Sequence, residues 1–157
     1  MSNNPSEWLL FKQKVANRIN LIKNPTPVYP QWQLDCVTWL KNNGYIASPH
    51  NPDENVTFTL FGYMMNNKWT KLNPIQPIDY LTQYGYIKNW HDGNELISMK
   101  TFGYIVSNKL KETITTTPID YLLSKGIITQ PRNPDETVNF WLLGAMLSNA
   151  NKKGIRI

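Results

Sequence analysis

Side chains that could bind a ligand recur in this 157-residue sequence at intervals of 41 residues. The first set is basic or titratable and consists of His50, His91 and Arg132. The second set is acidic and follows the first by four residues: Glu54, Glu95 and Glu136. Brought together around an axis, the basic set would meet an anionic sugar or phosphate, and the acids would hold sugar hydroxyls or a calcium ion. In the local alternative, each basic group hydrogen-bonds its own loop and each acid stabilises the N-terminus of the helix that follows it.

Tryptophans supply a second kind of binding chemistry, because aromatic faces stack on sugar rings. Trp32 opens the first of the recurring segments, and Trp90 stands in a loop beside His91 and Asp92. These two are the best candidates for carbohydrate contact. The alternative is that the six tryptophans of the chain serve core packing or contacts between repeats.

Catalysis and metal binding find little support in the sequence. One cysteine and two histidines do not make a zinc site of the Cys/His type, and the segment around Glu54 lacks the alternating oxygen ligands of a calcium loop. Cys36 occupies the position held by Pro77 and Pro118 in the sister segments, which predicts a small buried hydrophobe. Glycine-rich phosphate loops and His-Glu-x-x-His or Gly-x-Ser-x-Gly motifs are absent. We therefore expect no enzyme, no cofactor and no metal.

A repeat of 41 residues organises these candidates. It aligns six identical triplets without any insertion, and the glycine triplets are Gly44, Gly85, Gly126 and Gly62, Gly103, Gly144. The expected units span residues 32–69, 73–110 and 114–151. They follow an N-terminal amphipathic helix over 6–23, capped by Ser6, and precede a basic tail at 152–157. We assign all 157 residues to a single domain.

Each unit reads as helix, loop, helix. The first helix ends at the first glycine triplet, and the second begins after a cap supplied by Thr57, Ser98 and Asn139. Hydrophobic residues then recur with the period of a helix and form one apolar stripe per unit. Glycines inside the second helices predict a close helix approach around a shared axis. A third aligned triplet, Asn67, Asn108 and Asn149, is expected to cap the ends of these helices.

The repeat predicts an all-α fold. A unit of about 38 residues with a single apolar stripe cannot bury that stripe alone, so three units must pack on one another. They could form a short solenoid or close into a bundle about a pseudo-threefold axis. Closure is favoured, because three units are few for a solenoid but enough to bury three stripes.

The segments Trp32–Ile46 (WQLDCVTWLKNNGYI), Asn51–Thr57 (NPDENVT) and Asn133–Asn139 (NPDETVN) resemble the S-layer homology motif. Closely similar helix-loop-helix units occur in proteins of bacteriophages that infect Firmicutes. The resemblance covers about 120 residues. It implies three units about a pseudo-threefold axis, with ligand grooves between the repeats, in a module that anchors to the cell wall.

The leading expectation is a non-catalytic module, bacteriophage-encoded, that recognises bacterial cell-wall polysaccharide through inter-repeat grooves. The runner-up is a phage structural or accessory protein that binds another virion or surface protein. A third alternative is a small regulator that binds nucleic acid, but the net charge of +5 resides mainly in the first helix and the tail, so nucleic acid is the weakest alternative. Without a signal peptide or membrane span, we expect synthesis in the cytoplasm and action in the virion or at the bacterial surface.

Overall fold

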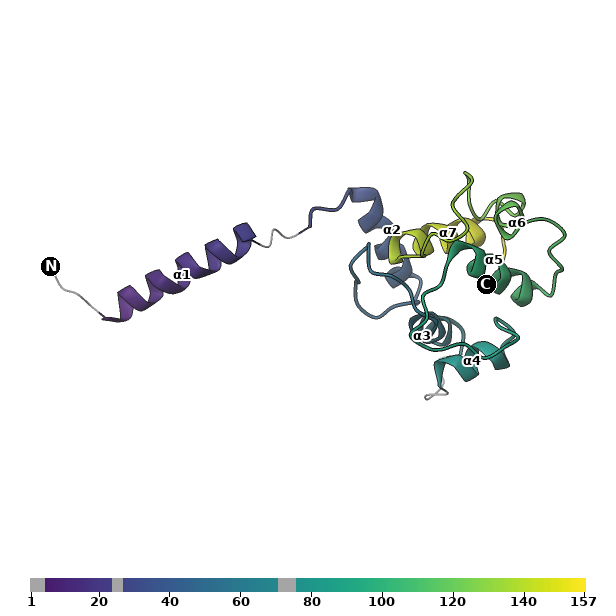
Figure 1. Cartoon of the computed structure of the whole chain (residues 1–157), viewed down its shortest axis with the longest axis horizontal. Coiled ribbons are helices and arrows are strands. Elements are labelled where there is room, and N and C mark those ends of the chain that lie inside the picture. The colour runs from purple at the N-terminus through teal and green to yellow at the C-terminus, as the bar shows by residue number, and fades with distance from the viewer. Residues whose placement is uncertain (1–4, 24–26, 71–75) are drawn as a thin grey trace.

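The computed structural model describes residues 5–23, 27–70 and 76–157 (Figure 1). Within these ranges the chain forms seven α-helices and no β-strand, which confirms the all-α class. The helices are α1 (Pro5–Lys23), α2 (Gln31–Asn42), α3 (Phe58–Trp69), α4 (Pro77–Gln83), α5 (Met99–Leu110), α6 (Pro118–Ser124) and α7 (Phe140–Lys152). Because α1 begins at Pro5, Ser6 lies inside this helix and is not its N-cap. Residue 73, the expected start of the second unit, lies outside the described ranges.

Helices α3, α5 and α7 begin where the capping residues predict. The side chains of Thr57, Ser98 and Asn139 accept hydrogen bonds from the backbone N–H groups three residues later, at 3.2, 3.2 and 3.1 Å. All three caps have extended backbones, as an N-cap requires. The predicted cap positions are therefore confirmed.

The turns that follow α2, α4 and α6 share one backbone conformation. Gly44, Gly85 and Gly126 have φ values of +79°, +76° and +66°, a region that only glycine enters at little cost. The next residue in each turn donates its N–H to a carbonyl of the preceding helix, as in Tyr86 to Leu81 at 2.8 Å. This bond is the 6→1 link of a Schellman motif and fixes the helix end.

A ring of three backbone hydrogen bonds joins the segments just before the second helices. The N–H of Val56 donates to the carbonyl of Val138, that of Val138 to Ile97, and that of Ile97 back to Val56, at 2.8, 2.8 and 3.0 Å. All three side chains are buried. We call these residues the valine–isoleucine ring. Each of the segments is linked to both others, so the backbone contacts close on themselves.

The helices pack in the same cyclic order. Helix α3 packs against α4, α5 against α6, and α7 against α2, so each second helix covers the first helix of another segment (Figure 1). The α7–α2 contact is the one that a closed arrangement requires and an open solenoid lacks. Buried side chains from the apolar stripes of α3, α5 and α7 fill the core between these pairs.

The glycines inside the second helices allow this packing. A Cβ atom on Gly62 would lie 2.6 Å from the carbonyl oxygen of Pro77, and one on Gly103 would lie 2.9 Å from that of Pro118. The predicted close approach of a second helix to its neighbour at these glycines is therefore correct. The neighbour is the start of another unit's first helix. The expectation that these glycines face a shared axis is not what the contacts show.

Two further expectations need correction. The aligned asparagines Asn67, Asn108 and Asn149 lie within the second helices and do not cap them. Their amides donate to the carbonyls of Tyr45, Tyr86 and Ile127, at 3.4, 3.3 and 3.1 Å, and thereby tie each helix to a glycine turn. The expected tail is also packed: the Ile157 side chain is buried, and its carbonyl accepts a 2.7 Å hydrogen bond from the Trp69 indole.

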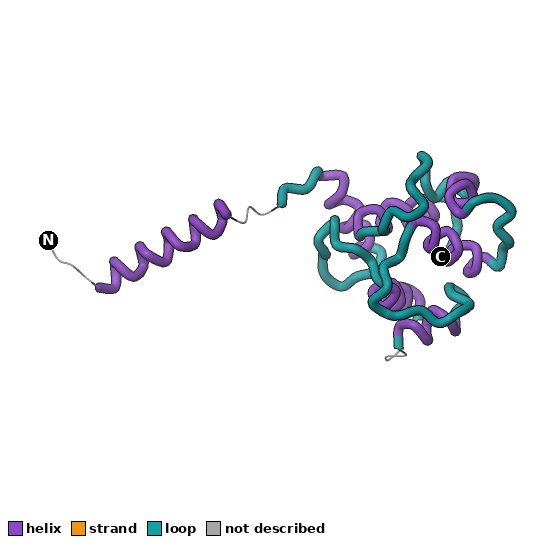
Figure 2. The backbone as a smooth tube through the Cα atoms, in the orientation of Figure 1, coloured by secondary structure: helices purple, strands orange, loops and turns teal. Residues whose placement is uncertain are grey.

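Helix α1 stands apart from the other helices (Figures 1 and 2). Among the described elements it packs against none. Within the described residues, no helix combines the length and apolar character needed to cross a lipid bilayer.

Gly103→Ala should destabilise the protein. The added methyl group would press on the Pro118 backbone, and such overpacking costs about 1–3 kcal/mol, which exceeds the gain of about 1 kcal/mol in helix propensity. Urea denaturation measures the free energy of unfolding, and Lys100→Ala at an exposed site of the same helix is the control, expected within about 0.5 kcal/mol of the parent. A Gly103→Ala variant more stable than the parent would contradict the close packing.

Tyr86→Phe should stabilise the protein at neutral pH. The Tyr86 hydroxyl is fully buried and has no hydrogen-bond partner among the described residues, a condition that costs about 1–3 kcal/mol. The Lys109 ammonium, 4.2 Å from the ring centroid, would keep its contact with phenylalanine. In contrast, Tyr80→Phe should cost about 1 kcal/mol, because that hydroxyl donates to the Met65 carbonyl. Denaturation curves that rank the two variants in the opposite order would refute this account.

Candidate functional site

The two sets of candidate ligands pair with each other. His50 Nδ1 lies 3.0 Å from a Glu54 carboxylate oxygen, and His91 makes the same 3.0 Å contact with Glu95. Arg132 binds Glu136 through two hydrogen bonds of 2.9 and 2.6 Å. Each basic group is therefore bound to an acid of its own loop, which is the local alternative that the sequence left open.

The histidines also pack across the junctions between segments. His50 stacks on Phe140 with ring centroids 4.2 Å apart, and His91 stacks on Phe58 at the same distance. Both phenylalanines are the first residues of second helices. These histidines thus help to join neighbouring segments, and their rings are covered on one face.

Within the part of the chain that the structure describes, no group of three or more His, Cys, Asp or Glu residues is placed to hold a metal ion. Cys36 is half-buried, less covered than the sequence predicted. Burial raises the pKa of its thiol, with a smaller contribution from the Asp35 charge. A raised pKa keeps the sulfur protonated, so Cys36 lacks the thiolate character of a reactive cysteine.

The two candidate tryptophans lie in different surroundings. The Trp90 side chain is 75% exposed. Trp32 is 52% exposed and contacts Trp141 edge to face, with ring centroids 4.9 Å apart and an angle of 85° between the rings. Trp32 belongs to α2 and Trp141 to α7, so this pair depends on the packing of these two helices.

Arg132 completes a partly exposed cluster. Its guanidinium carbon lies 5.4 Å from the centre of the Trp141 ring, within the range of a cation–π contact. We call Trp32, Arg132 and Trp141 the tryptophan–arginine cluster. Because Glu136 neutralises the arginine, the cluster presents aromatic surface and hydrogen-bonding groups with little net charge.

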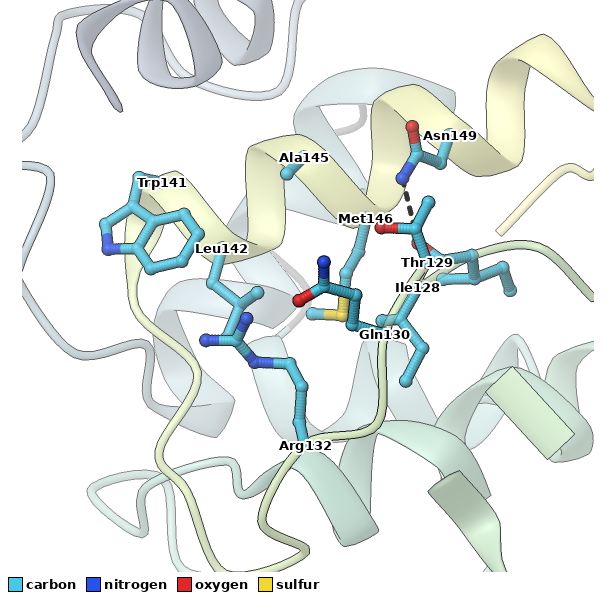
Figure 3. A pocket seen from close by; sticks show the side chains of 10 residues that line it. Ile128, Thr129, Gln130, Arg132, Trp141, Leu142, Ala145, Met146 and Asn149 are labelled. Carbon is cyan, nitrogen blue, oxygen red and sulfur yellow. Dashed lines mark hydrogen bonds between the residues drawn. The ribbon is translucent and has the colours of Figure 1, made fainter. Parts of the chain in front are cut away.

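A pocket opens beside this cluster, between α7 and the segment that follows α6 (Figure 3). Its volume is about 150 Å³. The polar side chains of its lining are Thr129, Gln130, Arg132 and Asn149, and Trp141 stands at one end (Figure 3). The apolar part of the lining comes from Ile127, Ile128, Leu142, Ala145 and Met146. The pocket thus combines an apolar base with a few polar groups.

A second pocket occurs at the equivalent place, 41 residues earlier. Its volume is about 300 Å³, and its lining includes Asn89, His91, Thr101, Tyr104 and Asn108. Both pockets lie between a loop and the second helix of the same segment. The resemblance predicted ligand grooves between repeats, whereas each of these two pockets lies within one segment. Only the first pocket reaches a junction, through the tryptophan–arginine cluster beside it.

Trp141 was absent from the residues chosen from the sequence. A signal was present, however, because the aligned positions hold Thr59 and Lys100. The other two segments carry polar side chains at this position. A tryptophan here therefore indicates a role in the third segment that the packing of the repeat does not require. The partner Trp32 is 109 positions away in sequence, so spacing alone did not connect the two.

No protein-family model, curated protein or solved structure matches the chain. The functional argument therefore depends on the geometry of the cluster and its pocket.

A double-mutant cycle should detect the Trp32–Trp141 contact. Edge-to-face aromatic pairs contribute about 0.5–1.5 kcal/mol beyond the area they bury, so Trp32→Ala and Trp141→Ala should couple by that amount. The measurement is the free energy of unfolding of both single variants and the double variant. The control cycle pairs Trp90→Ala with Trp141→Ala and should give no coupling. Additive effects of Trp32→Ala and Trp141→Ala would mean that α2 and α7 do not meet as described.

Proposed function

We propose that this protein is a non-catalytic binding module that recognises polysaccharide of the bacterial cell wall. The observation that carries the proposal is the contact of the half-exposed Trp32 with the partly buried Trp141, beside a pocket with polar lining. A sugar ring has an apolar face and a rim of hydroxyl groups. The cluster and the pocket offer a partner for each part.

The tryptophan–arginine cluster suits the apolar face of a sugar. Trp32 and Trp141 are nearly perpendicular, so their rings meet in a corner against which the apolar face of a sugar packs. Arg132 is held over Trp141 by its two bonds to Glu136, which fixes the ring contact before a ligand arrives. Such preorganisation reduces the entropy lost on binding.

The pocket lining suits the hydroxyl groups. The amide of Gln130 and the hydroxyl of Thr129 each offer both a donor and an acceptor, and both side chains are exposed. Since Arg132 and Glu136 neutralise each other, the site favours a neutral saccharide over a highly charged one. This preference separates wall carbohydrate from nucleic acid, whose binding depends on cation–phosphate contacts.

The size of the site favours one residue of a polymer. A volume of about 150 Å³ is below the range of about 300–1,000 Å³ typical of pockets that enclose drug-sized ligands. One open pocket of this size gives weak binding, but the second pocket in the middle unit would engage another residue of the same chain. Two linked weak sites bind a repeating polymer much more tightly than a free sugar.

The resemblance to the S-layer homology motif supports the wall as the source of this polymer. We place the activity at the bacterial surface or in a bacteriophage particle that reaches it. Of the two tryptophans predicted from the sequence to contact carbohydrate, Trp32 belongs to the cluster. Trp90 is exposed and stands in the sequence between Asn89 and His91, which line the second pocket.

Trp32→Ala should weaken binding to purified lipid-free cell walls of a Gram-positive bacterium by about tenfold or more, equivalent to about 1.4 kcal/mol. Co-sedimentation across a range of protein concentrations measures the affinity. Trp8→Ala is a matched control, because Trp8 is 60% exposed and α1 packs against no described helix. It should bind as the parent does.

Circular dichroism and thermal denaturation establish that each variant is folded. The proposal fails if the parent protein does not sediment with walls at low salt. It also fails if Trp32→Ala and Trp8→Ala bind equally well.

A further inference from the structure

Helix α1 exposes large apolar side chains that no described part of the chain covers. Trp8, Phe11, Val15 and Ile19 are 60, 56, 39 and 47% exposed. Leaving this much apolar area in water is unfavourable, and a cluster of this kind marks an interaction surface. The separation of α1 from the other helices leaves the surface accessible (Figure 1).

Four of the exposed apolar residues form one stripe, whereas Leu9 and Leu10 lie outside it. At 3.6 residues per turn, Trp8, Phe11, Val15 and Ile19 occupy a sector of about 80°. Trp8 and Phe11 stack within it, with ring centroids 5.6 Å apart. We call these four residues the apolar face of α1.

Cations border this face on both sides. Helical periodicity places Lys12 about 20° beyond one edge and Arg18 about 20° beyond the other. The Lys12 ammonium lies 5.4 Å from the centre of the Trp8 ring, which places this charge at the edge of the apolar face. Lys14 lies farther round on the Arg18 side, and residues 8–19 contain no acid.

From this arrangement we infer that α1 lies along an anionic lipid surface, with its apolar face inserted and its cations at the phosphates. Lysine and arginine stems follow apolar surface while their charged ends reach polar groups, so bordering cations suit a flat interface. Basic residues on an amphipathic helix add attraction to anionic lipids. Since α1 is not apolar enough to cross a bilayer, it lies in the interface.

A second copy of α1 fits the same face less well. Pairing two such faces would bring the bordering cations, Lys12 and Arg18, close to those of the partner, and residues 8–19 offer no acid to neutralise them. Like charges across such a seam oppose association. This inference does not depend on saccharide binding, because α1 and the tryptophan–arginine cluster share no residue.

Phe11→Ser should weaken binding of the full-length protein to vesicles of phosphatidylglycerol and phosphatidylcholine by about tenfold or more. Vesicle flotation measures the bound fraction. Leu10→Ser is the matched control, because Leu10 is 57% exposed but points away from the apolar face by helical periodicity. It should bind within about threefold of the parent.

The charges have a separate test. Replacing Lys12 and Arg18 by glutamine should weaken binding by about fivefold per cation, and added salt should weaken binding of the parent. Pure phosphatidylcholine vesicles should bind less protein than the anionic mixture.

Several outcomes would overturn the inference. One is absence of flotation with anionic vesicles at low salt, which would point to an acidic protein groove as the partner. Another is equal binding to neutral and anionic vesicles. A third is concentration-dependent self-association in analytical ultracentrifugation that Phe11→Ser abolishes, which would assign the face to a second copy. The wall preparations contain no lipid, so a negative result with vesicles leaves the test of saccharide binding unaffected.

Discussion

The valine–isoleucine ring is the constraint on which the rest of the helical body depends. Its three hydrogen bonds connect residues 56, 97 and 138, which are far apart in sequence, so the ring closes only when all three segments are in place. The capping residues follow immediately and start the second helices there. The valine–isoleucine ring thus fixes where the second helices begin and the direction in which each helix runs. Removing one segment would leave buried donors and acceptors unpaired in the other two, a cost that makes the body cooperative.

The closed contacts also explain why the candidate site exists at one junction. Packing of α7 on α2 brings Trp141 beside Trp32. At the position of Trp141, the other two second helices carry Thr59 and Lys100, which offer no indole for such a pair. The backbone contacts are repeated three times, whereas the Trp32–Trp141 pair occurs once among the described residues. The three junctions therefore share their backbone contacts, and side-chain differences decide which of them carries the candidate site.

Local signals explain what the sequence could predict. Thr57, Ser98, Asn139 and the glycine turns act within one helical turn of their own position, so their types and spacing predict the helix ends correctly. The amide of Asn108 acts across 22 residues and the Trp69 indole across 88. The repeat marks Asn108 but does not reveal its carbonyl partner, and it gives no sign of the Trp69 contact. The sequence left open that each basic side chain hydrogen-bonds within its own loop, but it did not identify the glutamate four residues later as the partner. The Trp32–Trp141 contact depends on closure and could be found only once the helices were placed.

Charge and aromatic surface are divided between two parts of the chain. Residues 8–19 of α1 carry three cations and no acid, whereas the arginine of the tryptophan–arginine cluster is neutralised by its own glutamate. Since α1 packs against no described helix, changes in its apolar face leave the core contacts of the body intact. In the two proposals, the neutral aromatic site binds its ligand by stacking and hydrogen bonds, and the cationic helix binds by apolar insertion and charge. Salt therefore separates them: it screens the cations of α1 while leaving contacts between uncharged groups nearly unchanged.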